Sequence, residues 1–522
     1  MNIPSQTPSK STVCKSAEPP VVIIGAGPTG LSAAYHLQSD ALLLEQNDRI
    51  GGWCRSIQAN GFTFDFAGHI MFSNDPYVHE LYQLLLGENV HWQDREAWIF
   101  SKGVYTRYPF QGALYGLPAE VIKECLLGAI EARYRNLNGD GQAHSPVSAQ
   151  GNVGEGEAKE LRGSCESPAL NDCCADGLLE STSALRPSRA GKAPQNFEEF
   201  IYANWGAGIA KHFAIPYNRK LWAVPLTEME TSWIAGRVPV PNLEEMIEGA
   251  LKEVPKPMGP NARFGYPLRG GFQKLMDGFW PHLKGPVLLN SRVTGVSPTR
   301  CLVELSDGSS LPYQFLISTM PLPSLVRLMK NEAPPEIQRA ASLLRSVSVR
   351  CVHLGIGREN LTEKHWIYYP EDTVFHRIFV QGNASPFCNP AGGFGLSCEI
   401  TYSPSKPLPC DGDALIRRCI EDCHKVGFFK PEDPVWAACQ VDLPCAYVVY
   451  DHERARNVVQ IRTWLAERNI ILSGRYSEWE YYNSDHAFLA GKKAADLIKE
   501  QGFSSFQRDE EASSIRYALG SV

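Results

Sequence analysis

The chain has 522 residues, of which 43% are hydrophobic, and it carries a formal net charge of −7. This length allows two or three folded domains around a large core, and the negative charge argues against a protein that binds nucleic acid through a basic face. No apolar run approaches the roughly 18 residues that span a bilayer, and residues 1–20 lack the apolar core of a signal peptide. We therefore expect a cytoplasmic protein without a membrane span.

The 15 cysteines follow no framework spacing, which is typical of reduced thiols. Cys419, Cys423 and His424 come nearest to a metal cluster, but their spacing on an amphipathic helix favours core packing. The sequence therefore predicts no metal site.

A glycine-rich turn near the N-terminus carries the first functional signal. Four β-branched residues at 21–24 predict a buried strand, and the glycines Gly25, Gly27 and Gly30 follow at the start of a helix. Such glycines allow a sharp turn and close approach of a pyrophosphate, which binds at the helix N-terminus near Pro28. Glu45 ends the next strand, where a carboxylate can accept a hydrogen bond from a ribose hydroxyl. This order predicts a Rossmann-like dinucleotide site.

Further along the chain, helices are expected at 119–132, 197–205 and 487–499. Short strands at 286–290, 292–296, 301–305 and 315–319 predict that sheet returns to the dinucleotide domain. Another strand at 470–472 enters a glycine turn. We find no second glycine motif of the same kind after a strand, so the sequence favours one tightly held cofactor and a separate substrate.

The predicted fold class is α/β, with a discontinuous Rossmann-like dinucleotide-binding domain and inserted helical and mixed α+β substrate domains. The segments rich in Gly, Ser, Ala, Pro and Glu without periodicity are expected to be disordered. The predicted segments are a disordered N-terminus at 1–19, dinucleotide-binding parts at 20–106, 256–325 and 451–502, a helical substrate domain at 107–255 with a disordered insertion at 136–195, a sheet-containing substrate domain at 326–450, and a disordered C-terminus at 503–522.

Two further features favour a flavin over a nicotinamide cofactor. Gly51 and Gly52 follow soon after Glu45 and add backbone N–H groups for an extended pyrophosphate. At the other end of the chain, Gly474 and Arg475 form a turn before a helix that begins near Asp485, although a plain strand-turn-helix remains an alternative.

Together these motifs resemble the amine-oxidase-like flavoproteins, which include protoporphyrinogen oxidase and UDP-galactopyranose mutase. Several stretches resemble the eukaryotic-type mutases in particular: 67–73 (AGHIMFS), 107–111 (RYPFQ), 215–225 (IPYNRKLWAVP), 233–237 (WIAGR), 259–261 (GPN), 366–372 (WIYYPED) and 474–481 (GRYSEWEY). The resemblance covers nearly the whole predicted folded body and skips the insertion.

The resemblance implies FAD, with NADPH or NADH as a possible reductant contacted near Arg95 and Tyr108. The residues predicted to contact FAD are Gly25, Gly27, Pro28, Thr29, Gly30, Glu45, Gln46, Gly51, Gly52, Trp53, Gly68, His69, Ile70, Val293, Gly474, Arg475, Asn483, Ser484 and Asp485. His69 is also predicted to act near the flavin N5, although a core histidine is the structural alternative.

For the substrate, the resemblance implies that Arg377 and Arg475 clamp a diphosphate and that Arg237 lies near the flavin and sugar. His69, Arg237 and Arg377 are the predicted catalytic residues. The predicted substrate-binding residues are Phe72, Tyr108, Phe110, Gln111, Asn218, Trp222, Asn261, Tyr368, Arg377, Tyr447, Arg475 and Tyr481. Taken alone, an arginine is more often a structural ion pair and a tryptophan more often core.

Enzymes of the mutase family interconvert UDP-galactopyranose and UDP-galactofuranose, and the resemblance implies attack of reduced flavin N5 on the anomeric carbon. No Ser-His-Asp, Cys-His or two-carboxylate arrangement stands out in the sequence, which agrees with a cofactor nucleophile. The alternatives are an oxidoreductase of the protoporphyrinogen-oxidase or amine-oxidase type and a non-catalytic flavoprotein that serves as an interaction platform. A homo-oligomer is also possible.

The chain departs from the mutase pattern at four places. Asn74 stands where the eukaryotic-type enzymes carry a second histidine, and Pro257 replaces an asparagine. The loop between Asp372 and Arg377 is one residue shorter, and Tyr447 precedes Val448 rather than a proline. These differences leave the natural sugar and the reaction outcome open.

Overall fold

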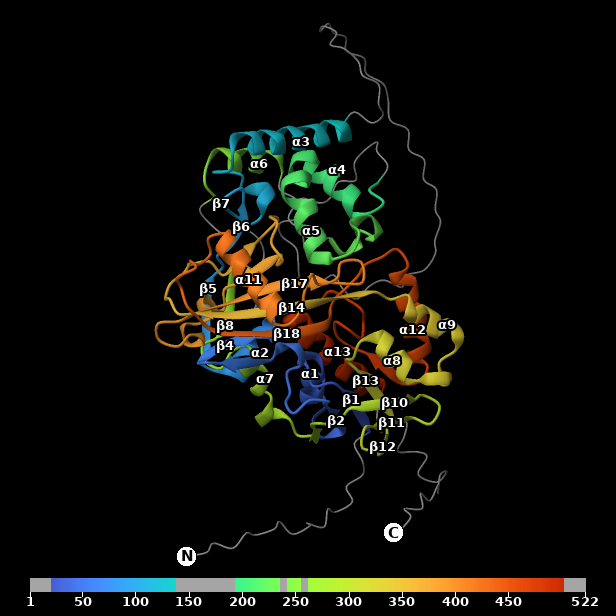
Figure 1. The fold of residues 1–522 in the computed structure, drawn as a ribbon. Helices are drawn as coiled ribbons and strands as arrows, with labels where there is room; N and C mark the ends of the chain where they lie inside the picture. Colours follow the sequence, from blue (N-terminus) through green and yellow to red (C-terminus); the bar gives the residue numbers. More distant parts are fainter. Residues whose placement is uncertain (1–19, 138–192, 235–241, 255–261, 502–522) are drawn as a thin grey trace, which may run out of the picture.

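The computed structural model describes residues 20–137, 193–234, 242–254 and 262–501 (Figure 1). The predicted disordered termini and nearly all of the predicted insertion lie outside these residues. Figure 1 shows three tiers: helices at the top, a broad sheet in the middle, and a smaller sheet with its own helices below.

The lower tier is built on a five-stranded parallel sheet in the order β19-β13-β1-β2-β9. Its strands are β1 (Val21–Ile24), β2 (Ala41–Leu44), β9 (Val287–Leu288), β13 (Phe315–Ser318) and β19 (Ile470–Leu472). The apolar strand β1 is buried along its whole length, as expected for the centre of a parallel sheet covered on both faces. Strands from three distant parts of the chain therefore form one Rossmann-like unit, which confirms the predicted fold class.

Helices cover this sheet, and two of them approach each other closely. Helix α1 (Pro28–Leu37) packs on α13 (Ser484–Gln501), where Gly491 lies so close to the backbone of Thr29 that a Cβ would overlap the Thr29 carbonyl oxygen. The other helices of the tier are α2 (Pro76–Leu86), α7 (Gln273–Asp277), α8 (Leu322–Leu328), α9 (Pro335–Ser342) and α12 (Arg454–Ala466).

Strands form in all four segments predicted within 286–319, and β9 and β13 join the parallel sheet. Strands β10 (Val293–Ser297) and β11 (Leu302–Leu305), with β12 (Ser310–Pro312), form a separate antiparallel sheet. The physical reason is the short turns, since a tight turn such as the one at Gly308 (φ 86°) can join only antiparallel neighbours.

The middle tier is a seven-stranded mixed sheet in the order β18-β14-β17-β16-β15-β6-β7. Its strands are β6 (Ala97–Ser101), β7 (Val104–Arg107), β14 (Ser346–Ile356), β15 (Trp366–Tyr368), β16 (Arg377–Phe379), β17 (Phe394–Tyr402) and β18 (Val435–Val448). Two two-stranded antiparallel sheets lie beside it: the hairpin of β3 (Ser56–Ala59) and β4 (Phe62–Asp65), and the pair of β5 (Val90–Asp94) with the distant β8 (Arg263–Pro267). The short helix α10 (Gln381–Ala384) contacts β17.

The two faces of this sheet are covered by different partners. On one face, Val352 and Leu354 pack with Cys419 of helix α11 (Asp413–Lys425). On the other face, Cys351 packs with Trp53 of the lower tier. Cys419 and Cys423 are fully buried, as predicted for core residues, and no described group of three His, Cys, Asp or Glu side chains is arranged to hold a metal. The second face is where the candidate site forms.

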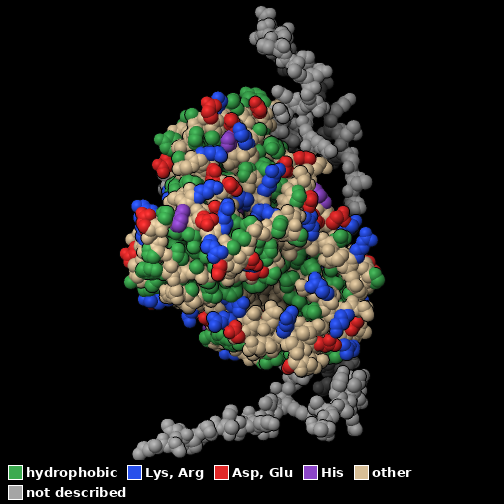
Figure 2. All heavy atoms as spheres, in the orientation of Figure 1, with side chains coloured by type: hydrophobic (Ala, Val, Ile, Leu, Met, Phe, Trp, Pro, Cys, Tyr) green, Lys and Arg blue, Asp and Glu red, His purple; other side chains and the backbone are tan. Residues whose placement is uncertain are grey.

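The upper tier contains α3 (Ala119–Leu137), α4 (Phe197–Ile209), α5 (Ile215–Trp222) and α6 (Leu243–Leu251), so the predicted helices at 119–132 and 197–205 are confirmed. Helix α5 contacts β17 and so links this tier to the middle sheet. None of the helices in the described ranges has the length and apolar character of a membrane span. Figure 2 shows positive and negative side chains mixed over the visible face.

Candidate functional site

Glycine turns converge at the carboxyl end of β1. Gly27 and Gly52 face each other so closely that a Cβ on Gly52 would lie 3.1 Å from the Gly27 Cα. Gly25 and Gly51 have φ values of 98° and 119°, which residues with side chains rarely adopt. Gly27 provides no side-chain cap for α1, and Gly25, Gly27 and Pro28 are partly exposed. The first N–H groups of α1 are therefore open to an anionic group such as a pyrophosphate.

Glu45 lies beside this turn with its carboxylate fixed. Its Oε2 accepts a hydrogen bond from the Ala26 N–H at 2.9 Å, and its Oε1 accepts from the N–H and the Nδ2 of Asn47 at 2.9 and 2.6 Å. A carboxylate has about four acceptor positions, so one remains for a ribose hydroxyl. The glycine turns around Gly25–Gly27 and Gly51–Gly52, which we call the cradle, therefore lie next to the predicted acidic residue Glu45.

The C-terminal segment lies against the same cradle. Gly474 (φ 85°) packs directly on the side chain of Thr29, and the Ser484 hydroxyl donates to the Ile70 carbonyl oxygen at 3.4 Å. Asp485, in the first turn of α13, is buried, whereas Asn483 is exposed. The start of α13 is thus brought next to the segment that contains Gly68 and His69.

Three other predicted cofactor residues lie at the edges of this region. Trp53 packs near Phe66, with ring centroids 6.5 Å apart. Gln46 is exposed, and Val293 begins β10 close to where the Ser291 N–H donates to the Glu45 carbonyl oxygen at 2.8 Å. The facing glycines, the uncapped helix and Glu45 fit a dinucleotide, and these residues would hold FAD.

The register of the middle sheet places three side chains in one row. Tyr368 of β15 is paired with Arg377 of β16, which is paired with Glu399 of β17. Directly opposed residues share a face of the sheet, so the side chains of Tyr368, Arg377 and Glu399 all project from the same face. It points toward the lower tier, because the Gly68 N–H donates to Glu399 Oε1 at 3.2 Å.

Arg377 and Glu399 form a buried ion pair. The Arg377 Nε donates to Glu399 Oε2 at 2.9 Å, and the Nη2 donates to the same oxygen. Burial opposes the charge on Arg377, but Glu399 and the neighbouring hydroxyls of Tyr447, Tyr217 and Tyr368 together outweigh it and raise the pKa of the guanidinium well above its ordinary value. Glu399 therefore holds both Arg377 and the backbone next to His69.

Tyr447 connects the two arginines that were predicted to clamp a diphosphate. Its hydroxyl accepts from Arg377 Nη2 at 3.3 Å, and the Arg475 Cζ lies 5.1 Å from its ring centroid. The Tyr447 ring is stacked with Tyr481 at 5.9 Å, and Trp222 contacts both rings at 6.0 and 6.3 Å. These contacts join five of the predicted residues into one continuous surface, which we call the wall: Arg377, Arg475, Tyr447, Tyr481 and Trp222.

Arg475 differs from Arg377 in having no carboxylate partner among the described residues. It donates to the carbonyl oxygens of Tyr482 and Ala446 at 2.9 and 2.8 Å, and its buried Nε has no hydrogen-bond partner. Arg475 is partly buried, and its charge is met by the faces of the Tyr447, Tyr476 and Tyr481 rings rather than by a carboxylate. Its positive charge is therefore available to an anion.

The predicted uridine stretch is only partly accessible. Tyr108 is partly exposed and its ring centroid lies 5.2 Å from that of Tyr368, whose hydroxyl accepts from Arg95 Nη2 at 2.9 Å. Phe110 is fully buried and stacked on Phe213 at 4.9 Å, and Gln111 is 3% exposed. Tyr108 is therefore the residue of this stretch whose ring can offer a face to a base.

His69 lies under the row and is neutral at physiological pH. Its ring stacks on Phe272 at 5.1 Å, and its Nδ1 has no hydrogen-bond partner. Burial, reinforced by the charges of Arg475 and Arg377, lowers the pKa of His69 to about 4. Nearby, Phe72 lines a cavity of about 700 Å³ together with Trp92.

Asn218 shares helix α5 with Trp222, and its Nδ2 donates to the Ala214 carbonyl oxygen at 2.8 Å. Arg237, Asn261 and Pro257 lie outside the described residues. Sequence reasoning gave no role to Glu399, although a glutamate inside the apolar strand 394–402 was a signal. It also missed Tyr217, whose ring centroid lies 5.5 Å from that of Tyr368.

Comparison with known proteins identifies the family of the chain. The family profile described as flavin-containing amine oxidoreductase matches residues 28–499. The chain belongs to this family. It is an FAD-dependent enzyme of the amine-oxidase superfamily.

Curated relatives match only a short stretch. A probable flavin-containing monoamine oxidase A of Dictyostelium discoideum and protoporphyrinogen oxidase 2 of Arabidopsis thaliana are each 39% identical over 64 residues, which is 12% of this chain. The match spans 14% and 13% of those proteins, respectively.

Solved structures match over nearly the whole chain. A crystal structure of reduced UDP-galactopyranose mutase is 27% identical, with a TM-score of 0.79, and the match covers 94% of this chain and 95% of that one. A putative protoporphyrinogen oxidase from Exiguobacterium is 16% identical with a TM-score of 0.64, covering 92% and 98%, and shows the shared fold. The resemblance to the mutases within the amine-oxidase-like flavoproteins is therefore confirmed.

Proposed function

We propose that the protein is an FAD-dependent nucleotide-sugar mutase that interconverts UDP-galactopyranose and UDP-galactofuranose or acts on a close relative. The observation that carries this proposal is the part of the wall where Tyr447 joins Arg377 and Arg475. The wall contains two guanidinium groups, and Glu399 neutralises only that of Arg377. The positive charge of Arg475 is therefore available to bind a negatively charged diphosphate. The mutase structure with 27% identity supports the same assignment.

The side chains would divide the work of holding the substrate. Arg377, Arg475 and Tyr447 bind the diphosphate and stabilise the negative charge that develops when UDP leaves. Tyr108 offers its ring to the uracil. Trp222 and Asn218 line the sugar side and keep water out. Reduced FAD, when bound, supplies the nucleophile for the anomeric carbon.

Two other groups have roles that follow from their surroundings. His69 presents a neutral imidazole with a free Nδ1, which suits proton transfer near the sugar because it adds no charge beside Arg377 and Arg475. Arg95 lies between Tyr368 and Trp366, with its Cζ 5.0 Å from the Trp366 centroid. We assign it to the phosphates of NADPH or NADH during flavin reduction.

The test is to reduce the purified protein with dithionite or NADPH without oxygen, add UDP-galactose, and separate the products by chromatography. We expect a new peak of the furanose form that is absent with oxidised protein. The proposal is wrong if no conversion occurs and UDP leaves the flavin spectrum unchanged. Oxygen-dependent oxidation of an amine or a porphyrinogen by the same preparation would instead support the oxidoreductase alternative.

A further inference from the structure

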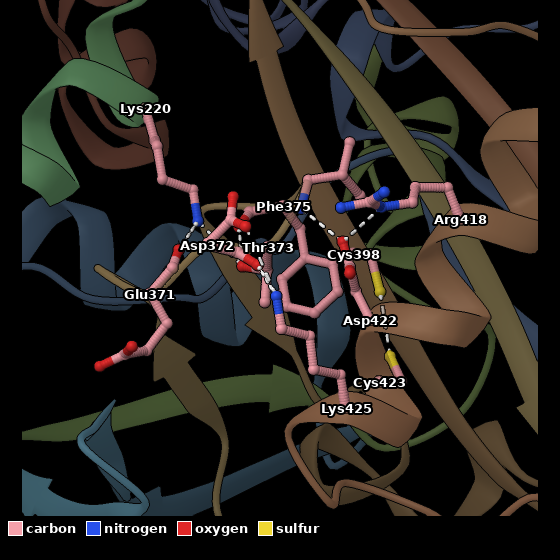
Figure 3. A network of polar contacts seen from close by, with 11 residues as sticks. Lys220, Glu371, Asp372, Thr373, Phe375, Cys398, Arg418, Asp422, Cys423 and Lys425 are labelled. Atoms are coloured by element: carbon pink, nitrogen blue, oxygen red, sulfur yellow. Dashed lines mark hydrogen bonds and ion pairs between the residues drawn. The ribbon is translucent and has the colours of Figure 1, made fainter.

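The loop that joins β15 to β16 is held by a lysine from the opposite side of the candidate site. This loop, residues 369–376, begins after Tyr368 and ends before Arg377, so its shape sets the position of both. It is also the loop whose length departs from the mutase pattern. Lys220 reaches it from α5, the helix that carries Asn218 and Trp222 (Figure 3).

All three donors of the Lys220 ammonium bind this loop. Its Nζ lies 2.9 Å from the Tyr369 carbonyl oxygen, 2.9 Å from the Glu371 carbonyl oxygen and 2.9 Å from Thr373 Oγ1. An ammonium has three N–H groups and no acceptor, so none is left for a ligand. Lys220 therefore acts on the site through the loop.

Hydrogen bonds within the loop connect Lys220 to the residues next to Arg377. Thr373 Oγ1, which accepts from Lys220, donates to the Phe375 carbonyl oxygen at 2.7 Å. The Tyr369 N–H donates to the His376 carbonyl oxygen at 2.9 Å, which closes the loop next to Arg377. The chain of bonds from α5 thus ends at the residue that precedes the diphosphate-binding guanidinium.

Helix α11 holds the same loop from its outer side (Figure 3). Asp422 Oδ2 accepts from the Val374 N–H at 2.7 Å and is itself bound by Arg418 Nε at 3.1 Å. The Lys425 Nζ donates to the Asp372 carbonyl oxygen at 2.8 Å. These contacts fix the outer edge of the loop, whereas the Lys220 contacts link it to the helix that carries Trp222.

We propose that Lys220 is a positioning residue that sets the spacing between Trp222 and Asn218 on α5 and Tyr368 and Arg377 on the β15–β16 hairpin. The UDP-sugar binds between these two elements, so this spacing determines its affinity. The inference deepens the proposed function and depends on it for the identity of the ligand. The link itself is a property of the protein without ligand.

The charge of Lys220 gives the link a pH dependence. Burial, helped by the charge of Lys406, lowers the pKa of Lys220 to about 7, while Asp422, Asp372 and Glu371 oppose this shift. His376 nearby is buried and its pKa is held well below the usual value, so it stays neutral near pH 7. A neutral amine has only two donors for three acceptors, so the loop loosens as the pH rises through about 7.

The closing experiment compares the wild type with Lys220→Met and Lys220→Arg, using UDP-galactose, whose diphosphate does not titrate near neutral pH. Affinity is measured from pH 6 to 8.5 by the change in flavin absorbance. We expect the wild-type affinity to fall with rising pH and Lys220→Met to bind about tenfold more weakly at pH 6. Lys220→Arg should bind within about threefold of the wild type and lose the pH dependence, because arginine stays charged.

Lys425→Met is the matched control, since it removes a lysine from the outer side of the same loop. It should change affinity by less than about twofold. An equal loss in Lys425→Met and Lys220→Met would overturn the inference, as would wild-type affinity in Lys220→Met. If Lys220→Met fails to fold, the pH profiles of the wild type and Lys220→Arg decide.

Hydrogen exchange of residues 369–377 without ligand separates this inference from the proposed function. Exchange should be faster in Lys220→Met than in Lys425→Met. If the wild type binds no UDP-galactose but shows this difference, the proposed function is wrong and the link stands. Equal exchange in the two variants contradicts the link itself.

Discussion

The glycine cradle around Gly27 and the wall around Arg475 are built on opposite principles. The cradle is made of backbone, with glycines so close to each other that added side-chain atoms would collide. The wall is made of side chains, two arginines and two tyrosines, with only one of the two charges balanced. The cradle therefore depends on close backbone packing, whereas the wall depends on the charge of its arginines. Substitutions in the cradle should mainly disturb packing and cofactor binding, and substitutions in the wall should mainly disturb binding of an anionic ligand.

The largest effect is expected in the cradle for Gly30→Ala. The new Cβ would overlap the Gly25 carbonyl oxygen, which belongs to the backbone that follows β1 and cannot move aside as a flexible side chain could. We expect a loss of stability of about 3 kcal/mol and loss of bound flavin, since overpacking without room to relax is costly. The ratio of absorbance at the flavin band to that at the protein band measures the flavin content, and urea unfolding measures the stability.

Gly103→Ala serves as the control for this prediction. Unlike Gly30, Gly103 has a positive φ, of 80°, but a Cβ there meets nothing within 4 Å. It should cost about 1 kcal/mol from backbone conformation and leave flavin content unchanged. Full flavin retention by Gly30→Ala would contradict the close packing of the cradle.

A smaller loss of stability is expected in the wall for Arg377→Met. The substitution leaves Glu399 buried without its partner, which should cost about 3 kcal/mol or less and weaken UDP-galactose binding while FAD remains bound. Adding Glu399→Gln should restore most of the stability but not the affinity. Thermal unfolding and ligand titration of the single and double variants measure these two effects. Loss of FAD in Arg377→Met would show that the residue belongs to the cofactor site.

The smallest change in stability is expected for Arg475→Met. Its removal takes away a partly buried charge and leaves the carbonyl oxygens of Tyr482 and Ala446 without these donors, so stability should fall by about 1 kcal/mol. The stabilisation by UDP-galactose, about 2.7 kcal/mol at 100 times the Kd in the wild type, should disappear. Thermal unfolding with and without ligand measures both. A destabilisation as large as that of Arg377→Met would mean that Arg475 is structural.

Much of the cradle could be predicted from the sequence. Gly25, Gly51 and Gly474 adopt positive φ values, and that requirement restricts these positions largely to glycine. Glu45 follows directly after its strand, so its place beside the turn follows from chain connectivity. The strands predicted at 292–296 and 301–305 form, but the sequence did not show that they pair in a sheet of their own, because a strand pattern identifies a strand but not its partners.

The wall was predictable only in part. The resemblance to the mutases named Arg377, Arg475 and Tyr447, but Glu399 lay in no quoted motif, and Lys220, although inside the stretch 215–225, was given no role. The resemblance also named Phe110, whose ring is buried in the core against Phe213, so its contact with a base stays a prediction. Burial of one aromatic ring among many depends on packing that spacing does not reveal.

By itself the sequence determined that the protein has a dinucleotide cradle, because the strand, glycines, helix and acidic residue that form it lie within one short stretch and impose local backbone constraints. The tertiary structure alone decided what faces that cradle. Tyr368, Arg377 and Glu399 meet through strand register, and Lys220 reaches a loop 149 residues away. A shift of register by one residue would turn every one of these row side chains to the other face, so no local pattern could have specified them.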